Sequence, residues 1–305
     1  MSTVDADLEI TETPAQAPGA ELTEARVARV GDMTVRRLLP LRLRRSVGAW
    51  CFVDHYGPMS VDGVTGMRVP PHPHIGLQTV TWLISGNVLH RDSLGSEQVI
   101  RPGQLNLMTA GRGIAHSERT PATMRATGGG MFGIQSWIAL PQEHEEMAPR
   151  FEHFDAATLP EVADGGMRTR VIAGSSFGKT SPVGMVSEWF YAEVMLEAGA
   201  SAPLDADHEE RAIYVTEGEV EIAGDKFEAP QLLIFRPGDR ITVKAIRPSR
   251  LMFLGGTALE GPRYLWWNFV SSRKERIEQA KDEWKTGRFA LIPGDNKEFI
   301  PLPDH

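Results

Sequence analysis

Short apolar runs closed by glycine or proline turns recur along most of the chain. Clear examples are Trp50–Pro58, Thr79–Ile84 and Leu105–Leu107. β-branched and aromatic residues are dense in these runs, which is typical of strands. No long helical pattern separates them. The pattern therefore predicts an all-β fold built from barrels or sandwiches.

The second half of the chain repeats the order of strands and turns found in the first half. Superposing the turn glycines Gly86 and Gly218 places Trp82 on Tyr214, and the strands that follow in the two halves also match in spacing. Repetition at this scale indicates an internal duplication. We therefore predict two tandem barrels of related fold.

The duplication sets the domain limits. We expect an acidic, mostly disordered tail over residues 1–25, with at most one short strand, because its acidic residues have no basic partners and Pro14 and Pro18 interrupt any helix. Residues 26–150 form the first domain and residues 151–305 the second.

One stretch near the C-terminus, Ser271–Gly287, follows a helical pattern. Ile277, Ala280 and Trp284 fall on one face, Ser272 with Glu275 predicts a capping box, and Gly287 is a natural end. We expect this helix to cap a barrel with its apolar face.

Composition and charge exclude several classes of function. The chain of 305 residues has a net charge of −8 and a single cysteine, Cys51, so a disulfide within the chain and a thiolate zinc site are excluded. The acidic balance disfavours direct nucleic-acid binding. No apolar run is long enough for a bilayer and no signal peptide is evident, so we expect a cytoplasmic protein without membrane contact. The basic run around Arg36 and Arg37 is interpreted as a solvated strand face.

Two pairs of metal-ligand side chains stand out. His72 and His74 form one pair, and His116 and Glu118 form the other. Within each pair the residues are two positions apart, and on a strand this spacing directs both side chains to one face. Two such strands side by side would gather three imidazoles and a carboxylate around one divalent transition metal.

The duplicated half lacks all four ligand types. The alignment places Leu204, Ala206, Val243 and Ala245 at the corresponding positions. We therefore expect metal in the first barrel and a metal-free second barrel.

Several motifs of the chain resemble the pirin family of the cupin superfamily, and the resemblance extends over nearly all of the chain after residue 25. The motifs are Val47–Trp50, Phe52–Pro58, Pro71–Gly76, Gly103–Leu105, Met108–Glu118 and Gly133–Trp137. The resemblance implies a bicupin, two tandem double-stranded β-helix barrels with a C-terminal capping helix. It also implies metal ligation by His72, His74, His116 and Glu118.

The resemblance further implies one Fe(2+) per chain, although sites of this kind also accept Mn, Ni, Co, Cu or Zn. One position departs from the general cupin pattern: Gln78 stands where a glutamate often follows the two histidines. Gln78 is then at most a hydrogen-bond partner of the metal ligands.

Two kinds of function follow from the resemblance. Some family members look like quercetin 2,3-dioxygenases, which open a flavonol ring with O2, whereas others are non-catalytic iron-binding regulators that act through a protein partner. The first reading is favoured, with Glu118 as both ligand and base for a small aromatic, flavonol-like substrate. A substrate other than a flavonol also stays open.

Four residues are candidates for contact with such a substrate: Phe52, His55, Phe132 and Gln135. The phenylalanines would supply flat walls and the other two polar contacts. Competing interpretations place these aromatic rings in the core and assign His55 a structural hydrogen bond. His90 and Asp92 are interpreted as part of a solvated hairpin rather than of the site.

Overall fold

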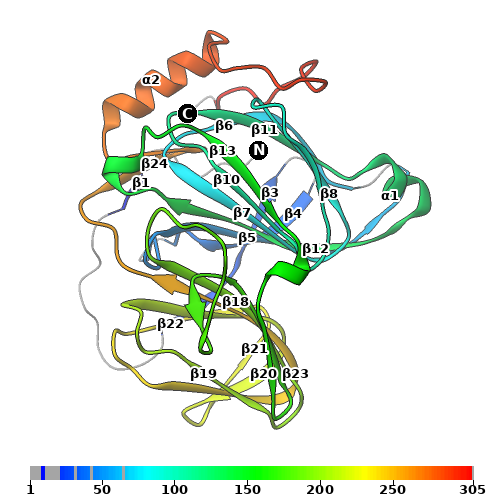
Figure 1. Ribbon diagram of the computed structural model, residues 1–305, viewed down its shortest axis with the longest axis vertical. Coiled ribbons are helices and arrows are strands. Elements are labelled where there is room, and N and C mark those ends of the chain that lie inside the picture. The colour runs from blue at the N-terminus through cyan, green and yellow to red at the C-terminus, as the bar shows by residue number, and fades with distance from the viewer. Residues whose placement is uncertain (1–7, 11–20, 31–32, 42–43, 64–65, 304–305) are drawn as a thin grey trace.

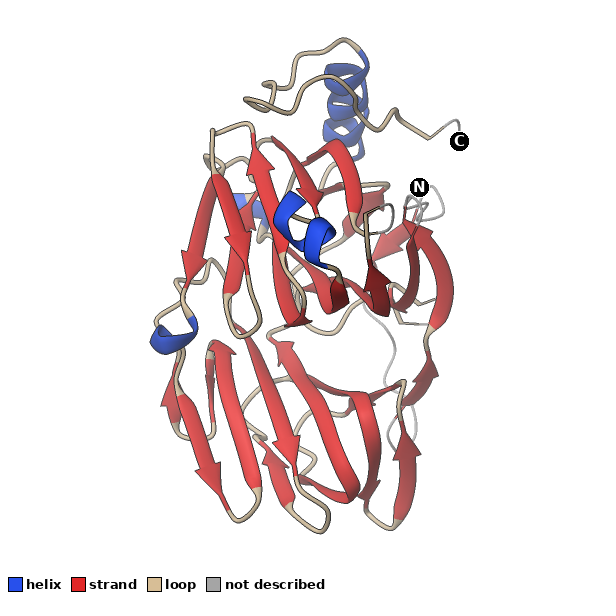
Figure 2. Ribbon diagram, turned by 90° about the vertical axis from the view of Figure 1, so that its right-hand side faces the viewer, coloured by secondary structure: helices blue, strands red, loops and turns tan. Residues whose placement is uncertain are grey.

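Two β-barrels, each built from antiparallel strands, stack along the long axis of the molecule (Figures 1 and 2). The computed structural model describes residues 8–10, 21–30, 33–41, 44–63 and 66–303. The expected all-β bicupin with a C-terminal helix is confirmed. The expected disorder of the tail falls largely on residues 1–7 and 11–20, which lie outside the described residues. The expectation of at most one short strand in the tail is wrong, because Leu8–Ile10 and Glu21–Glu24 both form strands.

The first barrel consists of two facing sheets. One sheet has the order β13-β10-β7-β12-β5-β4-β3 and the other the order β6-β11-β8-β9. The strands of the first sheet are β3 (Arg26–Val30), β4 (Met33–Leu39), β5 (Trp50–Val61), β7 (Leu77–Ser85), β10 (Leu105–Thr109), β12 (Gly129–Ala139) and β13 (Arg150–Phe154). Those of the second are β6 (Arg68–His74), β8 (Val88–Asp92), β9 (Glu97–Ile100) and β11 (Ile114–Arg119).

The second barrel is formed by one large sheet whose main path is β14-β15-β18-β23-β20-β22-β2, with β19 on β23 and β21 on β20. Its first strands are β2 (Glu21–Glu24), β14 (Glu161–Asp164), β15 (Met167–Ala173), β18 (Trp189–Leu196) and β19 (Ser201–Leu204). The remaining ones are β20 (Glu210–Ile222), β21 (Asp225–Glu228), β22 (Gln231–Phe235) and β23 (Ile241–Gly256).

Short elements complete the structure. The strands are the sheet β1 (Leu8–Ile10), β24 (Arg263–Trp266) and β25 (Phe269–Ser271) and the hairpin β16 (Ser175–Ser176) and β17 (Lys179–Thr180). The helices are the 3-10 helices η1 (Gln142–His144) and η2 (Ala156–Thr158) and the α-helices α1 (Ala122–Thr127) and α2 (Lys274–Lys285). Among the described residues, no helix has the length and apolar character that a membrane span requires.

Strand pairing confirms the internal duplication. Trp82 pairs with Leu105 in the first barrel, and Tyr214 pairs with Leu232 in the second. These are the positions that the sequence alignment matched. Trp82 and Tyr214 both enter the apolar core that joins the two barrels, together with Trp50. The duplicated sheets therefore pack against each other through equivalent faces.

The barrels exchange chain segments. Strand β2 lies near the N-terminus of the chain but pairs with β22 of the second barrel. Conversely, β24, β25 and α2 follow the second barrel in sequence and cover the outer end of the first (Figure 1). In space, each barrel thus includes residues from beyond the limits expected from the sequence.

The C-terminal helix is shorter than expected at its start. It begins at Lys274, and no side chain caps its N-terminus, so the predicted capping box of Ser272 and Glu275 is wrong. Its end is as expected: the amide of Gly287 donates to Trp284 and that of Arg288 donates to the carbonyl of Glu283, a Schellman arrangement.

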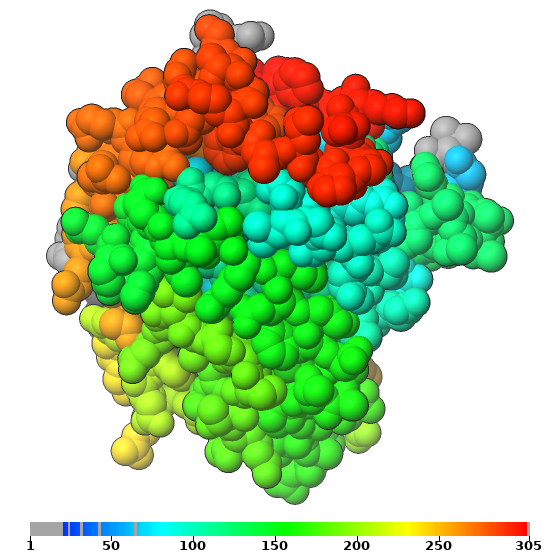
Figure 3. Space-filling view, turned by 45° about the horizontal axis from the view of Figure 1, so that its top comes forward, coloured from blue at the N-terminus to red at the C-terminus, as the bar shows by residue number. Residues whose placement is uncertain are grey.

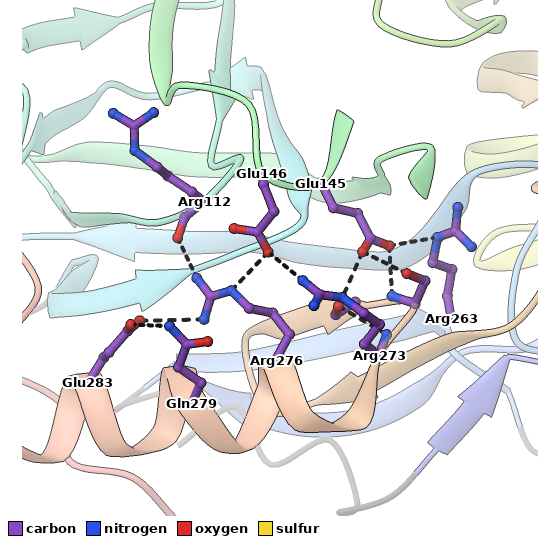
Figure 4. A network of polar contacts seen from close by, with 10 residues as sticks. Arg112, Glu145, Glu146, Arg263, Arg273, Arg276, Gln279 and Glu283 are labelled. Carbon is purple, nitrogen blue, oxygen red and sulfur yellow. Dashed lines mark hydrogen bonds and ion pairs between the residues drawn. The ribbon is translucent and has the colours of Figure 1, made fainter. Parts of the chain in front are cut away.

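Ser272 instead bonds to Glu145. Figure 4 shows Glu145 in a polar network that fastens the helix to the first barrel. The Glu145 carboxylate accepts hydrogen bonds from the Ser272 amide and hydroxyl at 2.7 and 2.9 Å and from the Ser271 hydroxyl at 3.1 Å. It also pairs with the Arg263 guanidinium at 3.1 Å, and both side chains are almost wholly buried. A tertiary partner has therefore replaced the local cap.

Replacing Glu145 by alanine is expected to destabilise the protein by about 3–5 kcal/mol, because it leaves a buried guanidinium without its counter-charge. Urea unfolding of Glu145→Ala beside Glu143→Ala, an exposed neighbour, measures the difference. The control should change by less than about 0.5 kcal/mol. Equal stability of the two variants would show that the network does not hold the helix.

Candidate metal centre

Two neighbouring strands, β6 and β11, bring the histidines of the first barrel together. His72 and His116 are direct register partners in this antiparallel pair, and His74 lies two residues along β6 on the same face. The register shifts between His116 and Glu118, where the ladder is irregular. The period-two spacing thus places His72 and His74 on one face beside His116, as the sequence predicts, whereas the irregular ladder sets Glu118 apart from them.

The three imidazoles converge on one point. The potential ligand atoms of His72, His74 and His116 all lie within 4.8 Å of one another. Among the described residues, these three form the one cluster of histidine, cysteine or acidic side chains that could hold a metal ion. The Nε2 atoms of His74 and His116 are 3.0 Å apart. At this distance at most one of the two nitrogens carries a proton, and when neither does, both lone pairs face one point where a cation would fit. The donor set therefore fits a transition metal.

Backbone carbonyls orient two of the rings. His72 Nδ1 lies 2.9 Å from the Pro70 carbonyl oxygen, and His74 Nδ1 lies 3.2 Å from that of Asn268, in the turn between β24 and β25. A carbonyl only accepts, so each Nδ1 carries the proton and each Nε2 keeps its lone pair. The C-terminal elements thus take part in the centre.

Burial keeps all three rings neutral at neutral pH. It lowers the pKa of His72 to about 4 and the pKa values of His74 and His116 well below the ordinary histidine value. A neutral imidazole is the form that binds metal.

Glu118 lies on the same cavity wall but outside the group of ligand atoms within 4.8 Å of one another. It is buried, and burial raises the pKa of its carboxyl to about 7. At neutral pH this carboxyl is thus partly protonated and partly ionised, so it can either donate or accept a proton. A bound cation would favour the ionised form.

Metal affinity is expected to fall in two stages on acidification. If Glu118 is a ligand, its protonation costs about one logarithmic unit of affinity per pH unit below about pH 7, because bound metal requires the ionised carboxylate. Protonation of His72 adds to the slope only near about pH 4. Chelator-buffered metal titrations across this range measure both stages. A flat affinity between about pH 7 and about pH 5 would remove Glu118 from the ligand set.

The histidines open into a cavity of about 270 Å³ with mostly apolar walls. Phe52 stacks on Trp137 with ring centroids 3.9 Å apart, and Trp137 meets the His74 ring edge-on at 5.1 Å. Other lining residues are Val30, Met33, Val35, Asp54, Tyr56, Met67, Val69, Pro70, Gln135, Trp267, Asn268, Phe299, Ile300 and Pro301. A flat apolar molecule matches these walls.

The C-terminal segment closes one side of this cavity, and Figure 3 shows the end of the chain lying across this end of the molecule. The Ile300 amide donates to the Pro71 carbonyl at 2.8 Å. Arg119 pairs with Asp295 at 2.7 Å and with Glu298 at 3.0 Å. These contacts place Phe299 and Ile300 in the cavity wall. A larger hollow of about 540 Å³ lies on the other side of this segment and does not include the histidines.

The four candidate substrate contacts divide into two groups. Phe52 and Gln135 line the cavity, whereas His55 and Phe132 are not among its lining residues. His55 Nδ1 contacts the Tyr214 hydroxyl of the second barrel, and its ring packs on Phe132 with centroids 4.6 Å apart. The reason is strand alternation: positions 52 and 54 of β5 face the cavity, so position 55 faces the other barrel.

Two expectations of solvated strands are wrong. His90 and Asp92 are buried, with 4% and 0% of their surfaces exposed, and His90 lies next to His116. Arg37 is also buried and forms a two-pronged ion pair with Asp54 in the cavity wall, at 2.7 and 2.8 Å. The period-two spacing of His90 and Asp92, the same as in the ligand pairs, was the signal that could have identified them.

Gln78 is buried on a different side of its strand from the centre. Its amide donates to the Thr109 hydroxyl at 2.9 Å, and it does not line the cavity. Its hydrogen bond is therefore to the neighbouring strand β10 and not to a histidine.

Comparisons with known proteins agree with this geometry. The family model described as pirin matches residues 32–138, and the one described as the pirin C-terminal cupin domain matches residues 191–290. A pirin-like protein of Caulobacter vibrioides is 46% identical over 284 residues, covering 92% of this chain and 98% of the relative. A Pseudomonas aeruginosa protein named "putative quercetin 2,3-dioxygenase" is 39% identical, covering 92% of this chain and 89% of its own.

Solved structures show the same likeness. Quercetin 2,3-dioxygenase from Acinetobacter baumannii has a TM-score of 0.86 at 35% identity and covers 94% of this chain and 96% of its own. A bacterial pirin from Escherichia coli in complex with nickel(II) shares the fold, with a TM-score of 0.63 at 20% identity, covering 79% of this chain and 100% of its own. With both of its cupin domains matched by family models, this chain belongs to the pirin family.

Proposed function

We propose that this pirin is a metal-dependent dioxygenase that opens the ring of a flavonol-like substrate with O2. The observation that carries the proposal is the joining of three neutral, converging imidazoles, a buried carboxyl and a flat apolar cavity in one barrel. The names of the Pseudomonas and Acinetobacter relatives support the reaction class.

His72, His74, His116 and Glu118 would hold the metal, which we propose to be Fe(2+). When bound, such a metal would polarise the substrate hydroxyl and supply the one-electron chemistry that reaction with O2 requires. The three rings are fixed beforehand by their hydrogen bonds and burial, so little ordering is needed on binding.

Glu118 would act as the base. Burial raises the pKa of its carboxyl to about 7 in the metal-free protein, and a bound cation would lower this pKa and keep the carboxylate ionised and able to accept a proton at neutral pH. The proton of the substrate hydroxyl would pass to an oxygen of this carboxylate, and the apolar surroundings exclude water that would compete for it.

The cavity would select the substrate by shape. Its volume of about 270 Å³ is just below the usual range for ligand pockets, roughly 300–1,000 Å³, which favours one small aromatic molecule without attached sugars. The stacked pair Phe52 and Trp137 offers a flat wall, and Gln135 offers a polar contact. His55 and Phe132, which lie behind this wall, would act only through the residues in front of them.

Aerobic incubation of the metal-loaded protein with quercetin tests the proposal. Loss of the flavonol absorbance together with consumption of one O2 per flavonol is expected, with neither in His72→Ala/His74→Ala. A metal-loaded protein that changes neither signal would overturn the proposed reaction.

A regulatory role through a protein partner is the second candidate. The C-terminal segment beside the cavity exposes two large apolar side chains, Leu291 at 70% and Phe299 at 65%. Both side chains line the hollow of about 540 Å³ beside Trp284 and Phe289, and a continuous apolar surface of this kind favours a protein contact. Metal-dependent capture of a partner, lost in Leu291→Ser/Phe299→Ser, together with no reaction on quercetin, would favour this role over catalysis.

A further inference from the structure

A buried row of hydrogen-bonded side chains runs from Asp92 through His90 to the proposed ligand His116. His90 Nε2 lies 3.1 Å from Asp92 Oδ2, and His90 Nδ1 lies 3.4 Å from His116 Nδ1. The three residues come from the neighbouring strands β8 and β11, where His116 is the register partner of Asp92. All three are at least 96% buried, so bulk water does not supply alternative partners.

Asp92 sets the direction of the hydrogen bonds along this row of side chains. Its Oδ1 accepts the amides of Leu94 and Ser96 at 2.9 and 3.0 Å, which fixes the carboxylate in one orientation. Oδ2 is then the acceptor that faces His90 Nε2, so this nitrogen carries the proton. The ring of His90 is also held in plane by stacking on Phe151, with centroids 4.3 Å apart.

The proton on His90 Nε2 determines the state of His116. A neutral His90 with its proton on Nε2 has a lone pair on Nδ1, and this lone pair accepts from His116 Nδ1. His116 Nε2 is then left with its lone pair, and this is the atom that lies 3.0 Å from His74 Nε2. The opposite tautomer would point an N–H at the position where the lone pairs converge.

We propose that Asp92 and His90 are positioning residues that hold His116 in the tautomer required for metal binding. His72 and His74 use backbone carbonyls for the same purpose, whereas His116 relies on two side chains. The inference rests on the metal centre of the proposed function, and it adds two residues that touch neither metal nor substrate. Outer partners of this kind contribute about 10–100-fold to metal affinity.

Asp92→Asn reverses the direction of these hydrogen bonds while it preserves the shape of the side chain at position 92. The amide oxygen keeps the Leu94 and Ser96 bonds, so the amide NH2 faces His90 Nε2 and forces the proton of His90 onto Nδ1. His116 must then move its own proton to Nε2. We expect an affinity lower by about 10–100-fold in chelator competition with Fe(2+) or Ni(2+).

Two further readings make the experiment decisive. Long-range ¹H–¹⁵N spectra of the metal-free protein report which nitrogen of His116 carries the proton, and this should change from Nδ1 to Nε2 in Asp92→Asn. Arg91→Gln, between the two residues on the same strand, should keep wild-type affinity and tautomer. His90→Phe retains the stacking on Phe151 and should also weaken binding, which covers the case in which Asp92→Asn does not fold.

The outcomes separate the two levels of the proposal. Wild-type affinity and an unchanged His116 tautomer in folded Asp92→Asn would overturn the positioning role and leave the metal centre in place. Absence of metal binding by the wild-type protein would overturn the proposed centre and, with it, the role of the pair.

Discussion

Glu118→Gln is expected to lower the rate of flavonol loss per bound metal by about 10²–10⁴-fold, the usual contribution of a general base. Glutamine fills the same space in the cavity wall, but its amide oxygen does not accept a proton at neutral pH. The wild-type rate should also rise with pH as the carboxyl loses its proton, with a midpoint below the metal-free pKa of about 7 because a bound cation favours the ionised form. In the variant this rise should be absent.

Rates in this experiment must be divided by metal content, because Glu118 is also a proposed ligand. Glu97→Gln makes the same chemical change on the exposed hairpin of the first barrel, where Glu97 pairs with Arg91 at 3.0 Å, and it should leave the rate unchanged. A rate per metal within about 3-fold of wild type in Glu118→Gln would assign the base to another group.

His116→Ala is expected to abolish metal retention. It removes the ring whose Nε2 faces that of His74, and the two remaining imidazoles with one carboxylate form a poor site for a divalent metal. The metal-free protein should keep its fold, with a melting temperature within a few degrees of wild type, because the ring borders a cavity and is not part of the apolar clusters.

The matched control is His208→Ala, a half-buried histidine of the second barrel whose ring nitrogen contacts the Ser175 carbonyl. This variant should retain the wild-type metal content in elemental analysis. Metal retained in His116→Ala and lost in His208→Ala would show that the metal binds in the second barrel, which contradicts the proposed centre.

The sequence predicts the fold and the histidines because both depend on short-range periodicity. Strand alternation places His72 beside His74, and equivalent turns place Trp82 and Tyr214 in one shared core. The interior of the second barrel shows the other side of the duplication. Apolar side chains, including Leu204, Val243 and Ala245, fill it where the first barrel has its three histidines and its cavity.

What the sequence could not supply depends on contacts between distant segments. The Asn268 carbonyl that orients His74 lies 194 residues further along the chain, and no local pattern announces it. Ser272 bonds to Glu145, which lies 127 residues away in sequence, instead of capping the helix, and no local pattern announces this contact either. The direction in which His55 points also became clear only from the barrel structure. Strand alternation alone gives two faces without showing which one lines the cavity.

The most direct test of the central claim is elemental analysis of the purified protein beside His72→Ala/His74→Ala. We expect one transition-metal ion per chain in the wild-type protein and almost none in the double variant, with both folded. Equal metal content in the two proteins, or no metal in the wild type even after reconstitution with Fe(2+), would contradict a metal centre formed by the histidines of the first barrel.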